Sequence, residues 1–188
     1  MTPSLANGLA AALLLARGRP EALALLPGDM ETARHSFVAA LICLPAFLAI
    51  RAIGWAMQGV PKAGVAIAVL AELTGYAVAW AGFALASRSL AGQAQRAAEW
   101  PRFIAAWNWA NVVQYLLLVA VLLPAALGLP GWLANTLGLA ALGYALWLEW
   151  FVTRIALGVP GPTAVLFVLL DVALGLIIGA FTARIAGS

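Results

Sequence analysis

The stretch that decides the fold is TAVLFVLLDVALGLIIGAFTARI, residues Thr163–Ile185, in which Asp171 and Arg184 are the only charged side chains. A helix needs roughly 20 mostly apolar residues to cross a hydrocarbon core about 30 Å thick, and this stretch is long enough. Four other stretches share this character: Phe37–Trp55, Ala63–Ala86, Phe103–Leu127 and Trp132–Phe151. The sequence therefore predicts an all-α, polytopic transmembrane helical bundle of five spans.

The composition agrees with a chain that lies mostly in lipid. Hydrophobic residues make up 65% of the 188 residues and charged residues 9%, whereas a soluble domain carries about 25% charged residues. The long runs do not alternate in polarity, which argues against a membrane β-barrel. The formal charge of +3 comes from arginines that flank the spans, so we expect no nucleic-acid partner.

The chain divides into an N-terminal segment, residues 1–33, and a five-helix transmembrane domain, residues 34–188. Leu5, Leu9 and Leu13 recur at helical spacing in the first segment. This spacing predicts an amphipathic interfacial helix on the cytoplasmic face, or equally a plain surface helix. Arg17 and Arg19 follow it, and we expect them to meet anionic lipid headgroups.

Positive charges predict the orientation of the spans. With five crossings, one side of the membrane holds Arg17, Arg19, Arg34, Arg88, Arg96, Arg102 and Arg154. The other side holds only Arg51, Lys62 and Arg184. Because cytoplasmic loops carry the excess of Lys and Arg, the N-terminus is expected in the cytoplasm and the C-terminus outside.

Three acids, Glu72, Glu149 and Asp171, fall within the predicted spans. A charged group inside a bilayer costs about 3 kcal/mol or more. Glu149 is expected near the cytoplasmic interface, where it pairs with Arg154 or snorkels to water. Glu72 and Asp171 are expected deeper.

Amide side chains mark the third span. They are Asn108, Asn111 and Gln114, followed by Tyr115. Residues 108 and 111 are three apart and residues 111 and 115 four apart, a spacing that places these side chains on one helix face. We expect a buried polar layer made of Glu72, Asn108, Asn111, Gln114 and Asp171, with Arg51 able to reach Glu72. Two explanations stay open: hydrogen bonds that hold the helices together, or a proton or solute site.

No catalytic or metal-binding pattern is visible. His35 is the only histidine and Cys43 the only cysteine, so a nucleophile–base pair or a metal-ligand set cannot be assembled from them. The sequence predicts no enzyme activity, no cofactor and no metal site.

The layout resembles the bacterial relatives of the Yip1-type membrane proteins. The resemblance rests on Arg34-His35-Ser36-Phe37, Asn108-Trp109, Glu149-Trp150 and Asp171. It implies a five-span protein of the bacterial inner membrane with a cytoplasmic N-terminus and an exterior C-terminus. Eukaryotic members imply roles in membrane trafficking, which bacteria lack, so that role is not carried over.

The leading functional prediction is a non-enzymatic integral membrane protein that organises lipids or membrane-protein partners. Its expected partners are membrane lipids, other membrane proteins or further copies of itself. The alternative prediction is a small transporter or channel subunit that uses Glu72 and Asp171.

Overall fold

The computed structural model describes residues 5–187, and every regular element in that range is a helix. The all-α prediction is therefore confirmed. The elements are α1 (Leu5–Ala16), the 3₁₀-helix η1 (Pro20–Leu25), α2 (Met30–Ser36), α3 (Val38–Gln58), α4 (Val65–Gln93), α5 (Trp100–Ala126), α6 (Gly131–Leu157) and α7 (Gly161–Ala186).

Five helical stretches are long and apolar enough to cross a membrane, as the sequence predicts. The first of them, Met30–Gln58, combines α2 and α3, which follow each other with only Phe37 between them. The predicted division after residue 33 thus falls inside α2. These five helices indicate a multi-pass membrane protein.

α4 runs further than its apolar core. The second predicted stretch ends at Ala86, but α4 continues to Gln93. The segment after Ala86 contains no proline before Pro101, so nothing stops the helix at the end of its apolar part. Ser87 is buried there and its hydroxyl accepts a hydrogen bond from Trp100 Nε1 at 3.1 Å.

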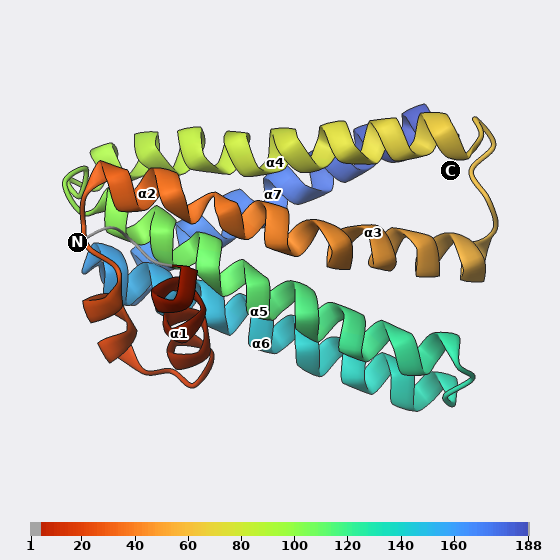
Figure 1. Ribbon diagram of the computed structural model, residues 1–188, viewed down its shortest axis with the longest axis horizontal. Helices are drawn as coiled ribbons and strands as arrows, with labels where there is room; N and C mark the ends of the chain where they lie inside the picture. The colour runs from red at the N-terminus through yellow and green to blue at the C-terminus, as the bar shows by residue number, and fades with distance from the viewer. Residues whose placement is uncertain (1–4, 188) are drawn as a thin grey trace.

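The long helices form two groups that diverge. α5 packs against α3 and α6, while α4 packs against α7. The helices lie close together at the end that carries α1, and toward the end that carries the C-terminus α5 and α6 separate from α4 and α7, with α3 ending between them in this view (Figure 1). We call these the α1 end and the open end of the bundle.

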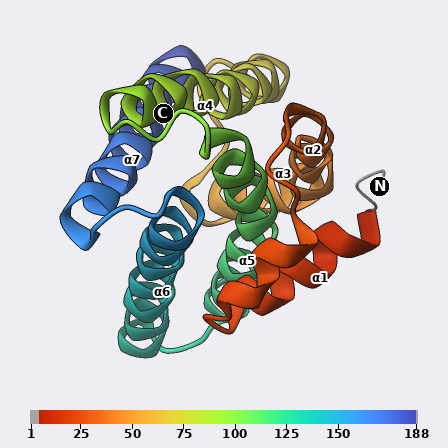
Figure 2. The ribbon, with the colours of Figure 1, turned by 90° about the vertical axis from the view of Figure 1, so that its left-hand side faces the viewer.

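α1 lies across the bundle rather than along it. Figure 2, which looks at the α1 end, shows α1 crossing in front of α5. Gly8, Ala11, Ala12 and Leu15 form its buried face, and the Tyr144 hydroxyl of α6 donates a 2.6 Å hydrogen bond to Ala16 O. Leu5, Leu9 and Leu13 are exposed on another face of α1.

Candidate functional site: a polar cleft at the open end

A polar cavity of about 530 Å³ opens between α3, α4 and α7 at the open end of the bundle. The connection between α3 and α4 forms its rim. This connection is fixed to α7, because Ala63 N donates a 3.1 Å hydrogen bond to Ala186 O. The polar side chains that line the cavity are Arg51, Gln58, Lys62 and Glu72.

Arg51 and Glu72 form an ion pair across this cavity. Arg51 Nε lies 3.0 Å from Glu72 Oε2, with side-chain exposures of 39% and 8%. Arg51 lies seven residues before the end of α3 and Glu72 seven residues after the start of α4. The two helices follow each other in the chain and run antiparallel. Residues at equal distances from their shared connection therefore lie at the same height along the bundle. The expected contact between Arg51 and Glu72 is thus present.

A smaller cavity of about 140 Å³ continues inward from the ion pair. Both cavities are lined by Arg51 and Glu72, so the pair lies where they meet. Three aromatic rings line the inner cavity: Phe47, Tyr76 and Tyr115. The centroid of the Tyr76 ring lies 4.6 Å from that of Phe47 and 6.1 Å from that of Tyr115.

The amide side chains of α5 do not join Glu72. Asn108 Nδ2 donates to Ser36 Oγ at 2.7 Å, and Asn111 Nδ2 donates to Trp107 O at 3.0 Å. Gln114 Nε2 donates to Ala145 O at 3.0 Å. Within residues 5–187, these bonds link α5 to α2, to itself and to α6, so the expectation of one connected polar layer was wrong.

The depths of the acids explain why the layer does not form. Because α4 extends to Gln93, Glu72 lies about 31 Å along the helix from its α1 end. Asp171 lies only about 15 Å from the start of α7 by the same rise. The two carboxyl groups therefore lie at different levels of the bundle, and Glu72 belongs to the cleft alone.

The Glu149 side chain does not reach the surface, so the predicted snorkelling to water is wrong. It is buried, and one carboxylate oxygen, Oε1, has no hydrogen-bond partner. Its side chain interacts with Asp171 and with the Trp107 indole. Arg154 instead places its guanidinium over the Trp150 ring, 4.8 Å from the centroid, and the expected pair of Glu149 with Arg154 is absent from the part of the chain that the structure describes.

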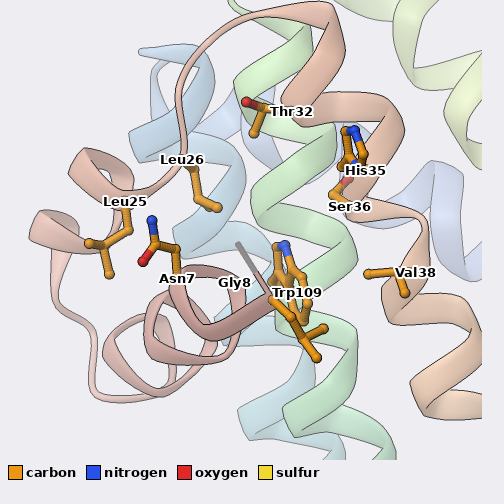
Figure 3. A pocket seen from close by; sticks show the side chains of 10 residues that line it. Asn7, Gly8, Leu25, Leu26, Thr32, His35, Ser36, Val38 and Trp109 are labelled. Carbon is orange, nitrogen blue, oxygen red and sulfur yellow. The ribbon is translucent and has the colours of Figure 1, made fainter. Parts of the chain in front are cut away.

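A second pocket, of about 250 Å³, lies between α1 and α2 at the α1 end. Figure 3 shows Trp109 between Gly8 on one side and Ser36 and Val38 on the other. Thr32 also lines it, and its buried hydroxyl has no hydrogen-bond partner. Arg17 and Arg19 are exposed in the turn that follows α1.

The aromatic part of the cleft was not predicted. Tyr76 is the residue that sequence reasoning missed, whereas Tyr115 was already placed on the polar face of the third span. A useful signal was present, because Tyr76 follows Glu72 by four residues and so lies one turn away on the same helix face.

Comparisons with known proteins give no relative. The chain matches no protein-family model, no curated protein and no solved structure. The site therefore has to be interpreted from its own geometry.

Proposed function

We propose that this multi-pass membrane protein binds a small polar solute in the cleft and acts as a transporter or channel subunit. The observation that carries the proposal is the ion pair of Arg51 with Glu72, which lies where an open polar cavity meets an inner aromatic one. Ionisable groups inside membrane proteins typically face a water-filled cavity and mark solute pathways. No catalytic role is proposed for any residue.

The orientation is part of this proposal. The positive charges of the sequence favour a cytoplasmic α1 end, which turns the cleft toward the exterior. A location in the bacterial inner membrane, like the Yip1-type resemblance, stays a prediction.

A second candidate function, the organisation of membrane lipids, is favoured by one observation. An apolar groove of about 420 Å³ runs between α4 and α7 and is lined mainly by aliphatic side chains, with Phe181 at one wall. A groove of this kind suits an acyl chain. Native mass spectrometry of the purified protein tests this function, and bound lipid that persists in mild detergent supports it.

Water access to the cleft is tested by cysteine labelling in a Cys43→Ala background. Gly54 and Gly179 line the cavity, and a Cβ atom at either meets nothing within 4 Å. Gly143 of α6 is the matched control, because a Cβ there is equally free and the position is exposed on the outside of the bundle. In proteoliposomes, a charged thiol reagent should modify G54C and G179C and spare G143C. Equal labelling of all three would refute a water-filled cleft.

Transport itself is tested by efflux. Proteoliposomes are loaded with a cell metabolite extract, and mass spectrometry follows which solutes appear outside. At least one solute should leave faster than from liposomes without protein, and the Glu72→Gln variant should slow its release. If no solute leaves faster, the proposed function is wrong.

A further inference from the structure

The charge balance of the cleft restricts what can bind there. Arg51 and Glu72 neutralise each other, and the Glu72 side chain is only 8% exposed. A simple anion that binds Arg51 would leave Glu72 as a buried unpaired carboxylate. A simple cation that binds Glu72 would leave Arg51 without its partner. The first outcome is costly because Glu72 is withdrawn from water and needs a partner, and the second gives up the ion pair of Arg51 without replacing it.

A zwitterion avoids this penalty. Its anionic group can replace Glu72 at the Arg51 guanidinium, while its cationic group replaces Arg51 at the Glu72 carboxylate. Every charge then keeps a partner and the net charge of the site does not change. A planar guanidinium also suits a carboxylate or a phosphate, because it can donate two parallel hydrogen bonds.

The surroundings of the pair give the zwitterion a direction. Phe47, Tyr76 and Tyr115 line the inner cavity, which both Arg51 and Glu72 border, and the Arg51 guanidinium lies over the Phe47 ring, 5.5 Å from its centroid. Aromatic faces attract cations, and groups of aromatic rings recognise quaternary ammonium ions. The outer cavity has one aromatic residue in its lining, Trp55, and adds the Lys62 ammonium, which favours an anionic group there.

We propose that the cleft binds a small zwitterion, with its ammonium group inward at Glu72 and the three aromatic rings and its carboxylate or phosphate outward at Arg51. This inference rests on the proposed function, because it names the class of solute for the same cleft. The same chemistry occurs in free solutes and in the headgroups of zwitterionic lipids.

Thermal unfolding of the purified protein in a non-ionic detergent tests the inference. The probes are phosphocholine, glycine betaine and phosphoethanolamine, compared at equal ionic strength with phosphate and with tetramethylammonium, which each carry one of the two charges. At least one zwitterion should raise the unfolding temperature by on the order of 5 °C near saturation, and the single ions should not. No shift with any zwitterion, or an equal shift with phosphate or tetramethylammonium, would overturn the inference.

Variants locate the binding site. Arg51→Gln and Glu72→Gln should each abolish the shift. Arg96→Gln is the matched control, because it breaks another arginine–glutamate pair, that of Arg96 with Glu99 at 3.5 Å, at the opposite end of the bundle. A shift that survives in both cleft variants would overturn the inference. The comparison of probes on the unaltered protein decides the question even if a variant does not fold.

Two further experiments distinguish a free solute from a lipid headgroup as the ligand, and zwitterion binding from transport. In nanodiscs, a lipid source predicts that phosphatidylethanolamine suppresses the shift caused by the free zwitterion, whereas phosphatidylglycerol does not. A free-solute source predicts the same shift in both lipids.

Binding of a zwitterion without efflux supports this inference and contradicts transport. Efflux of solutes that include no zwitterion supports transport and contradicts this inference.

Discussion

The contact between α1 and α5 gives the sharpest stability prediction. A methyl group at Gly8 would overlap the indole of Trp109, with ring atom Cδ2 at 2.6 Å and two other ring atoms closer still. Carbon atoms in contact prefer about 3.5–4.0 Å, so the Gly8→Ala variant must displace α1 or the ring by about 1 Å or more. Trp109 is only 4% exposed.

The expected cost of Gly8→Ala follows from overpacking. Forcing a methylene into a filled site typically costs about 1–3 kcal/mol, which exceeds the gain of up to about 1 kcal/mol from replacing a helical glycine with alanine. If α1 leaves its place, the hydrogen bond from Tyr144 to Ala16 is lost as well, about 0.5–1.5 kcal/mol.

Limited trypsin digestion in mild detergent reports on this docking. Arg17 follows α1 directly and precedes Gly18, whereas Arg19 precedes Pro20, a bond that trypsin does not cut. A displaced α1 should therefore make cleavage after Arg17 faster in Gly8→Ala than in the parent protein. Gly143→Ala is the control, since its methyl group meets nothing within 4 Å. Equal digestion and equal unfolding temperatures for the Gly8 variant and the parent would refute the argued contact with Trp109.

Three other predictions follow from the bundle, each measured as thermal unfolding in detergent. Arg51→Gln should lower the free energy of unfolding by about 2 kcal/mol. This is less than the roughly 3–5 kcal/mol for breaking a fully buried pair, because Arg51 is 39% exposed. Adding Glu72→Gln should restore most of the loss, and additive losses in the double variant would contradict the pairing. Gly75→Ala should cost about 1–3 kcal/mol, because its Cβ would lie 2.5 Å from Thr182 Cγ2, and Thr182→Ser should rescue it by removing that methyl group. Asp29→Ala should destabilise α2 by removing its N-cap. The hydrogen bond from the Thr32 backbone N–H lowers the pKa of the Asp29 carboxyl in the folded protein. The stabilisation by this cap is therefore present above the pKa of the unfolded state and is lost as the pH falls through the pKa of the folded state. A deficit that stays constant on acidification would contradict this.

The sequence predicted the five long apolar helices correctly, because one physical requirement determines them. Backbone groups inside a bilayer must be hydrogen-bonded within the helix, so long apolar runs determine the spans. The expected contact of Arg51 with Glu72 was also correct, because each residue lies seven residues from the helix end that faces their shared connection.

The rotation of each helix about its axis was beyond the sequence. Spans that are apolar on every side give no signal for which side faces the protein. The sequence consequently could not show that Glu149 points inward. The true end of α4 was equally hidden, because helices continue beyond the bilayer where no residue stops them, and this error placed Glu72 at the level of Asp171.

The hydrogen bond between Ala63 and Ala186 sets an upper limit on the aperture of the cleft. It anchors the far part of the α3–α4 connection to α7, so the remaining tether runs only from Gln58 to Ala63. Five extended residues span at most about 18 Å. With this anchor in place, the mouth can admit a metabolite or a single lipid headgroup but excludes a folded domain.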